Sequence, residues 1–145
     1  MMKIFKLLKK IIFSLLLVAA ILFAGLRLLG FSPFNIETKS MEPNYPVYTL
    51  VYVKNINFNE IKKGDVITYI NQSGSFVTHR ITSIDYTERS VRTKGDANEF
   101  EDIMPTYEEN IVGKVYFKIP YLGKISSFIT EKFENLFPER SKFTQ

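Results

Sequence analysis

Residues 65–84, DVITYINQSGSFVTHRITSI, contain two stretches of strand-forming residues with a polar segment between them. Residues 65–70 and 76–84 are rich in Val, Ile, Thr and aromatic side chains, which are favoured in β-strands. Residues 71–75, NQSGS, supply the Asn, Gly and Ser that are typical of a turn. The segment therefore predicts two strands joined by a turn.

Further strand-forming stretches recur at spacings of roughly ten residues, with turn residues between them. They are residues 47–53 (VYTLVYV), 65–70, 76–84, 90–94 and 111–118. Short strands at this spacing are typical of a small antiparallel barrel or sandwich. A chain of 145 residues also favours one folded domain. We therefore expect residues 31–123 to form a mainly β domain.

Residues 11–30, IIFSLLLVAAILFAGLRLLG, are almost entirely apolar and contain one charged residue, Arg27. A membrane-spanning helix needs about 20 mainly apolar residues, and a basic side chain near its end can reach the lipid headgroups. A cleavable signal peptide would have a similar pattern, and Val18-Ala19-Ala20 offers the small residues of a cleavage site. The apolar run continues through residues 21–23, however, which favours a transmembrane anchor.

Basic residues are concentrated before the expected anchor, at Lys3, Lys6, Lys9 and Lys10. The positive-inside rule places residues 1–10 in the cytoplasm and the β domain outside the cell membrane, as a single-pass protein. Five of the 19 Lys and Arg residues precede residue 31, which leaves 14 against 15 Asp and Glu, a net charge of −1. This balance predicts no nucleic-acid partner, whereas acidic lipid headgroups suit the basic tail.

The sequence contains no cysteine and a single histidine, His79. Disulfides, a thiol nucleophile, a thiolate metal site and a zinc site with several histidines are thereby excluded. Any enzymatic chemistry must use hydroxyls, carboxylates, amines and this one imidazole, and we expect no cofactor or metal.

The C-terminal stretch, residues 124–145, has a different periodicity. Its apolar residues recur at helical spacing with charged residues between them: Ile125, Phe128, Ile129, Phe133 and Leu136. This pattern predicts an amphipathic helix, and its charges exclude a second membrane span. The helix either packs on the β domain or lies in the membrane interface, and the sequence leaves both open.

Three kinds of residue could act together in catalysis. Ser40 follows the anchor by ten residues, and His79 shares one face of its strand with Val77 and Ile81. Asp96 lies in the segment TKGDAN (93–98) and Asp102 follows six residues later. Individually these are ordinary turn, core and loop residues. Together they permit a serine made nucleophilic by a histidine, with a carboxylate orienting the imidazole.

Three short motifs, in this order after the anchor, resemble those of type I signal peptidases. They are Ser40-Met41-Glu42-Pro43, Thr78-His79-Arg80 and the segment TKGDAN (93–98). The resemblance is to the archaeal and endoplasmic-reticulum branch, which also occurs in some Gram-positive bacteria and has histidine where other members have a lysine base. Residues 63–67 (KGDVI) and 111–115 (IVGKV) resemble two further family strands. The likeness extends from the anchor to about residue 123.

The resemblance implies a serine endopeptidase that removes signal peptides from secreted preproteins. Ser40 would be the nucleophile and His79 the general base, while Asp96 and Asp102 match the two acids of the family. We expect Asp96 to orient His79 and leave the role of Asp102 unassigned. The Ser40 N–H and the Thr38 hydroxyl would stabilise the oxyanion. The substrate would bind extended, with small side chains at the first and third positions before the cut.

The sequence departs from the family pattern at Lys39, where a glycine commonly precedes the nucleophile. Neighbouring side chains on an extended chain point in opposite directions, so Lys39 is not expected to be the base. The charged C-terminal helix is a second departure, because many relatives have another span there. An alternative function is a non-catalytic, membrane-anchored β domain that binds a cell-surface partner. It explains the anchor and the strands but leaves the three motifs as coincidence.

Overall fold

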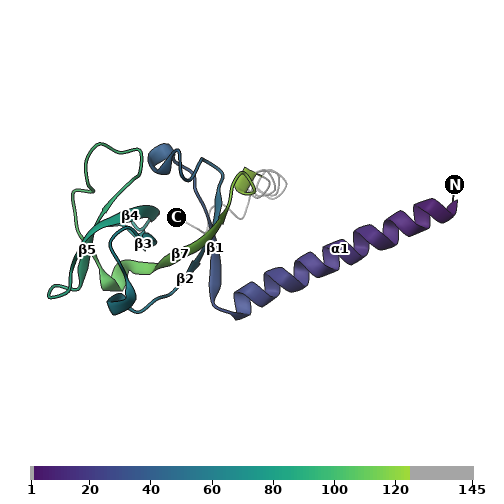
Figure 1. The fold of residues 1–145 in the computed structure, drawn as a ribbon, viewed down its shortest axis with the longest axis horizontal. Coiled ribbons are helices and arrows are strands. Elements are labelled where there is room, and N and C mark those ends of the chain that lie inside the picture. The colour runs from purple at the N-terminus through teal and green to yellow at the C-terminus, as the bar shows by residue number, and fades with distance from the viewer. Residues whose placement is uncertain (1, 125–145) are drawn as a thin grey trace, which may run out of the picture. The chain divides into compact units, whose positions relative to one another are not determined.

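The computed structural model of the chain describes residues 2–124 (Figure 1). It divides into two compact units, residues 1–32 and 33–145. The first consists of a long helix with its connection, and the second contains a β-sheet. The amphipathic helix expected within residues 124–145 lies outside the described residues from residue 125 onward.

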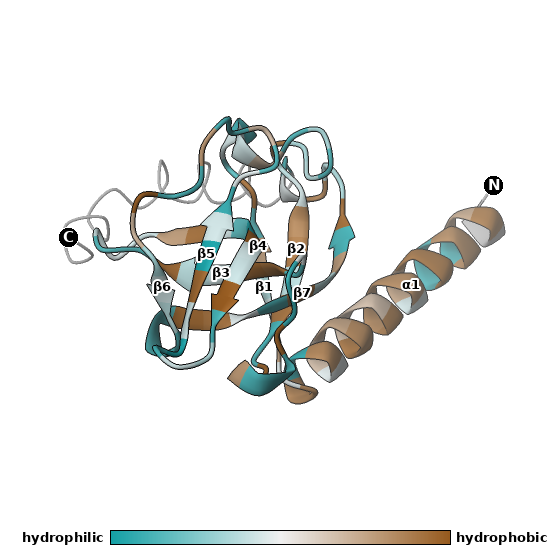
Figure 2. Cartoon of the chain, turned by 60° about the vertical axis from the view of Figure 1, so that its left-hand side comes forward, coloured by the Kyte–Doolittle hydropathy of each residue, from teal (hydrophilic) through white to brown (hydrophobic). Residues whose placement is uncertain are grey.

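Helix α1 (Met2–Leu28) has the length and composition of a membrane span. A stretch of 18 residues within Ile4–Leu28 has a mean hydropathy of 2.5, and the large apolar side chains of the helix are exposed. Figure 2 shows hydrophobic colouring along most of α1. A helix that is apolar on all sides suits a hydrocarbon environment. The helix ends where Gly30 adopts a positive φ of 85°, a conformation that favours glycine and terminates helices.

The second unit is built on one seven-stranded sheet with the order β1-β2-β7-β3-β4-β5-β6. Its strands are β1 (Phe31–Asn35), β2 (Leu50–Lys54), β3 (Val66–Ile70), β4 (Phe76–Asp85), β5 (Ser90–Lys94), β6 (Thr106–Tyr107) and β7 (Ile111–Ile119). Three short 3-10 helices lie between strands: η1 (Lys39–Met41), η2 (Phe58–Glu60) and η3 (Glu108–Asn110). The expected mainly β fold with an N-terminal apolar helix is confirmed.

Strands β1 and β6 were not expected from the sequence. Strand β1 contains Pro33, which lacks the N–H needed for a continuous ladder. It is nevertheless compatible with a strand here because β1 lies at the edge of the sheet. Strand β6 has only two residues, too few for an alternating pattern to be visible.

The hairpin of β3 and β4 forms as the opening segment predicts. Ile67 pairs with His79 and Tyr69 with Val77, so these four side chains share one face. The turn between the strands is closed by Asn71, whose Oδ1 accepts hydrogen bonds from the backbone N–H groups of the two serines that follow in the turn. The hairpin thereby fixes the position of the only histidine.

The sheet curls, so that strands far apart in its order approach each other. The rings of Phe34 and Phe76 lie 5.0 Å apart, although β2, β7 and β3 separate their strands in the sheet. Register shifts in the β2–β7 and β3–β7 pairings favour this curvature. One apolar cluster comprises Ile36, Met41, Val51, Val53, Val66 and Val115, and another comprises Phe58, Ile61, Ile67, Tyr69, Ile81 and Val91. The curl brings the segment after β1 against β4.

Gly113 on β7 provides a test of this packing. It pairs with Thr68 on one side, and a Cβ at this position would lie 2.3 Å from the carbonyl oxygen of Lys54 on the other. We expect Gly113→Ala to destabilise the domain by about 1–3 kcal/mol, because backbone atoms would have to move. Thermal unfolding should show a Tm lower by roughly 4–8 °C for each kcal/mol. The control is Gly25→Ala, where a Cβ meets nothing within 4 Å, and equal Tm values for both variants would contradict the packing argument.

Candidate active site

Ser40 lies in η1, on the segment that the curled sheet brings against β4. Its backbone carbonyl accepts a hydrogen bond of 2.8 Å from the N–H of Ala97. Gly95 makes this approach possible, since a Cβ there would lie 2.5 Å from the same carbonyl oxygen. The neighbouring Met41 is fully buried and fixes the segment in the core. The TKGDAN segment thus holds the backbone of the serine in place.

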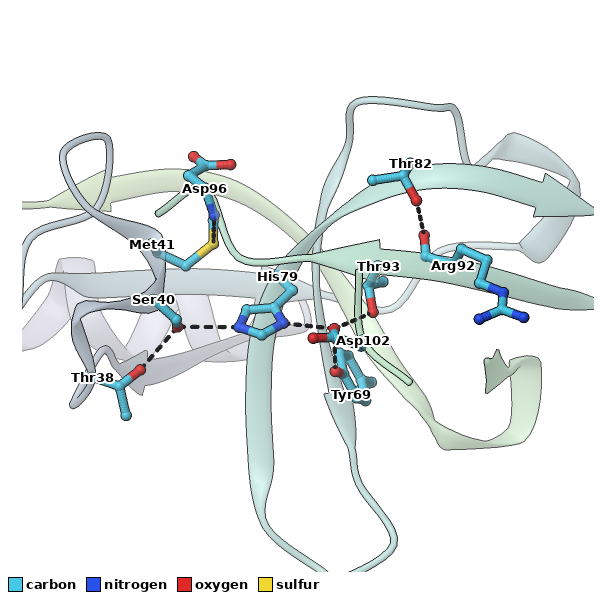
Figure 3. A network of polar contacts seen from close by, with 10 residues as sticks. All are labelled: Thr38, Ser40, Met41, Tyr69, His79, Thr82, Arg92, Thr93, Asp96 and Asp102. Atoms are coloured by element: carbon cyan, nitrogen blue, oxygen red, sulfur yellow. Dashed lines mark hydrogen bonds and ion pairs between the residues drawn. The ribbon is translucent and has the colours of Figure 1, made fainter. Parts of the chain in front are cut away.

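His79 projects from β4 into a largely buried position, where it is 7% exposed. Its Nε2 lies 3.1 Å from the Oγ of Ser40, and its Nδ1 lies 2.7 Å from the Oδ2 of Asp102. Figure 3 shows the imidazole between the hydroxyl and the carboxylate, with a polar contact on each side. The carboxylate requires a proton on Nδ1, which leaves Nε2 free to accept the hydroxyl proton of Ser40. This is the tautomer that a general base needs.

Asp102 comes from the loop after β5 and is held by several groups. Its backbone N–H donates to the carbonyl of Thr93 at 2.8 Å. Its Oδ2 accepts hydrogen bonds from the Thr93 hydroxyl at 2.6 Å and the Tyr69 hydroxyl at 3.0 Å, in addition to the contact with His79. Burial acts to raise the pKa of Asp102, but the hydrogen bonds from His79 and Thr93 outweigh it and leave this pKa lowered. The carboxylate is therefore charged at neutral pH.

Asp96 does not contact His79, so the prediction that it orients the imidazole is wrong. Its carboxylate accepts two hydrogen bonds of 2.7 Å from Arg80 and one of 2.9 Å from the Asn44 amide. The reason is the alternation of β4, where His79 and Arg80 are neighbours and point to opposite faces. Asp96 lies on the Arg80 face, and Asp102 lies on the His79 face. Figure 3 shows the Asp96 carboxylate directed away from the imidazole.

The contacts of Asp96 instead connect the serine segment to the sheet. Asn44 belongs to the segment that follows Ser40, and its backbone carbonyl accepts a further hydrogen bond from the Lys118 amine. Hydrogen bonds from Arg80 are the main cause that lowers the pKa of Asp96, which is 9% exposed in its side chain. The ion pair therefore restrains the Ser40 segment from one side, while Ala97 restrains it from another.

Thr38 lies beside the serine, with its Oγ1 3.0 Å from the Oγ of Ser40. Both residues line a cleft of about 670 Å³. One wall of the cleft consists of residues 34–38, 40 and 41 and the other of residues 75–79. A cleft between two extended segments suits an extended polypeptide, because backbone groups along strand edges can pair with it. Lys39 is exposed to solvent.

Several residues at the site were not singled out from the sequence. Arg80 and Thr93 belonged to quoted motifs, and a basic side chain next to the candidate base, together with two candidate acids, was a signal for an ion pair. Tyr69 and Asn44 lie just outside the quoted motifs, and the sequence offered no signal for either. Across residues 2–124, no group of three His, Asp or Glu side chains is placed to hold a metal ion.

A serine hydroxyl that contacts an imidazole, which in turn contacts a carboxylate, is the arrangement typical of serine hydrolases. The comparisons with known proteins narrow this class. The profile of the family described as "Signal peptidase, peptidase S26" matches residues 8–102, a range that includes Ser40, His79 and both acids. The chain belongs to this family of signal peptidases. It is also 34% identical over 113 residues to signal peptidase I W of Bacillus subtilis (strain 168). The matched region covers 70% of this chain and 58% of the length of that relative.

The Arg80–Asp96 pair leads to a prediction about stability and pH. Asp96→Asn should destabilise the domain by about 2 kcal/mol at neutral pH, since it removes a charge that accepts hydrogen bonds from Arg80 and Asn44. The folded-state pKa of Asp96 is lowered. Its contribution to the free energy of unfolding is therefore complete above its unfolded-state pKa of about 3.9 and disappears as the pH falls through its folded-state pKa.

The measurement is Tm between pH 7 and pH 2 for the wild type and Asp96→Asn. The difference in Tm should be constant down to about pH 4 and then shrink on further acidification. A Tm difference that grows on acidification, or none at pH 7, would contradict the role of the ion pair.

Proposed function

We propose that this chain is a membrane-anchored serine endopeptidase that removes signal peptides from preproteins. Ser40 is the nucleophile, His79 the general base and Asp102 the carboxylate that orients the imidazole. Asp96, held by Arg80 of β4, positions the nucleophile segment through its hydrogen bond with Asn44. The observation that carries the proposal is the continuous contact from Ser40 Oγ to His79 Nε2, at 3.1 Å, and from His79 Nδ1 to Asp102 Oδ2, at 2.7 Å. Membership of the signal peptidase family supplies the substrate class.

In the first half of the reaction, His79 takes the proton of the Ser40 hydroxyl as its Oγ attacks the carbonyl carbon of the scissile bond. The carbonyl oxygen becomes an oxyanion, for which the Ser40 N–H and the Thr38 hydroxyl are the proposed donors. Thr38 supports this role because its Oγ1 lies 3.0 Å from the nucleophile. The carbon–nitrogen bond then breaks, and His79 donates its proton to the departing amine of the mature protein.

In the second half, the signal peptide is held as an ester on Ser40. Water attacks the ester carbonyl and gives a proton to His79, which returns it to the serine oxygen when the ester bond breaks. The signal peptide leaves with a new carboxylate. Asp102 stays ionised throughout and stabilises the imidazolium in both halves. Its lowered pKa supports this role.

The cleft of about 670 Å³ is the proposed binding site for the end of the signal peptide. Residues 34–37 and 75–78 offer backbone groups on its two sides, and the nucleophile lies on its wall. The family resemblance suggests small side chains at the first and third positions before the cut. Strand-like binding supports this spacing, because alternate side chains of an extended peptide face the same wall.

A cleavage assay on a preprotein tests the proposed function. The wild type should release the mature chain, and Ser40→Ala and His79→Ala should each abolish release while leaving Tm close to that of the wild type. Asp102→Asn should lower kcat by up to about 10⁴-fold, because the imidazole loses the charge that selects its tautomer. Activity of the wild type should fall on acidification as the imidazole becomes protonated.

The control for the hydroxyl is Ser83→Ala, which removes an exposed serine of β4 outside the cleft and should cleave normally. Cleavage by Ser40→Ala would refute the proposal and favour a domain that binds preproteins or surface proteins without cutting them.

The proposed placement is at the outer face of the cell membrane, with residues 1–10 in the cytoplasm. Four lysines precede the apolar core of α1, which supports this orientation. The ten residues from Gly30 to Lys39 reach at most about 35 Å when fully extended, and less with β1 folded. The nucleophile is thereby restricted to the neighbourhood of the lipid headgroups, where membrane-inserted signal peptides end.

Lengthening this connection tests the placement. A flexible Gly/Ser segment of about 20 residues inserted between Gly30 and Phe31 leaves β1 intact. It should lower the cleavage rate of a membrane-inserted preprotein while sparing a soluble peptide substrate. The two rates are measured side by side in lipid vesicles. If both substrates are cleaved as by the wild type, proximity to the membrane is not part of the mechanism.

A further inference from the structure

One oxygen atom at the site receives more hydrogen-bond donors than the mechanism uses. The Oδ2 of Asp102 is contacted by His79 Nδ1 at 2.7 Å, Thr93 Oγ1 at 2.6 Å and Tyr69 Oη at 3.0 Å. These donors come from three neighbouring strands of the sheet, β4, β5 and β3. The imidazole has a chemical role, and the threonine also holds the Asp102 backbone. The tyrosine is left without an assigned role.

Tyr69 is built into the site rather than lying at its edge. It is 7% exposed and shares a face with His79 on the β3–β4 hairpin. Its ring meets the imidazole in an edge-on arrangement, with centroids 6.4 Å apart and planes at 67°. Burial, above all other causes, raises the pKa of Tyr69 to about 12. The phenol therefore keeps its proton over the whole range in which an imidazole titrates, and it acts as a donor throughout.

A carboxylate oxygen has about two lone-pair positions, so three donors on Oδ2 compete for its charge. We propose that Tyr69 is a positioning residue that sets how strongly Asp102 binds the imidazole of His79. Only the expected effect on kcat and kcat/KM rests on the proposed function. The phenol fixes Oδ2 opposite Nδ1 and, by taking a share of its negative charge, weakens the hold of the carboxylate on the imidazolium.

Other ionisable groups near the pair are arranged so that this effect can be isolated. On the opposite face of β4, Arg80 and Asp96 form their own ion pair. Glu101 precedes Asp102 and is exposed, and Tyr107 of β6 is exposed as well. Both line the cavity of about 920 Å³ onto which Tyr69, His79 and Asp102 also open. Removing one phenol oxygen from Tyr69 leaves all of these charges unchanged.

The test is Tyr69→Phe in the full-length chain in lipid nanodiscs. Because the chain contains a single histidine, NMR of histidine-labelled protein reports the titration of His79 alone. Without the phenol, more carboxylate charge is available to the imidazolium, so the titration midpoint should move to higher pH by roughly half a unit. The acid limb of kcat/KM should move with it. On the plateau kcat should fall about fivefold, the value of one ordinary hydrogen bond, with KM within about twofold of the wild type.

Tyr107→Phe is the matched control, since it removes a phenol oxygen from the same cavity and should change neither quantity. Thr93→Val, which removes the other neutral donor, should shift the midpoint in the same direction as Tyr69→Phe. A Tyr69→Phe protein that matches the control in midpoint and kcat, or a midpoint that moves to lower pH, overturns the inference. Absence of Ser40-dependent cleavage by the wild type would instead refute the proposed function, and the NMR titration would still decide the role of Tyr69.

Discussion

The alternation of side chains along β4 is the constraint on which the site depends. His79 and Arg80 are consecutive, so one faces the apolar cluster that includes Tyr69 and the other faces the opposite side of the sheet. His79 binds Asp102 on its face, and Arg80 binds Asp96 on the other. The two pairings could be exchanged only if the strand were turned over. A shift of one residue in the register of β4 would exchange the two faces and dismantle both contacts.

The segment after β5 provides both carboxylates because it crosses from one face of β4 to the other. It begins at Gly95, where the backbone passes too close to the Ser40 carbonyl to allow a side chain. Asp96 follows immediately and remains on the Arg80 face, whereas Asp102 is reached only after the chain has returned to Thr93. One short segment thus determines the backbone position of Ser40 and the orientation of the His79 imidazole.

Sequence reasoning could predict the β3–β4 hairpin, the apolar helix and the candidates Ser40 and His79, because each depends on local periodicity or on a motif. It did not predict which acid contacts His79, since both acids lie in one loop and their faces are set by how that loop crosses β4. Strand β1 was missed because Pro33 argues against a strand unless its position at the sheet edge is known. Tyr69 was missed because a tyrosine in a strand is ordinary. Only the register of three strands shows that its hydroxyl meets Asp102.

The electrostatics of Asp102 follow from the same geometry. A carboxylate that is withdrawn from water loses hydration, which alone would favour its protonated form and remove the charge that an imidazolium requires. Donors from β3, β4 and β5 replace that hydration, and their combined effect keeps the pKa of Asp102 below its ordinary value. In the proposed mechanism the neutral donors, Tyr69 and Thr93, matter because the imidazole is uncharged each time it is about to accept a proton. If His79 alone bound Asp102, the charged form of the carboxylate would be least stabilised whenever the imidazole is neutral. The hydroxyls of Tyr69 and Thr93 keep the carboxylate ionised in both states of the histidine.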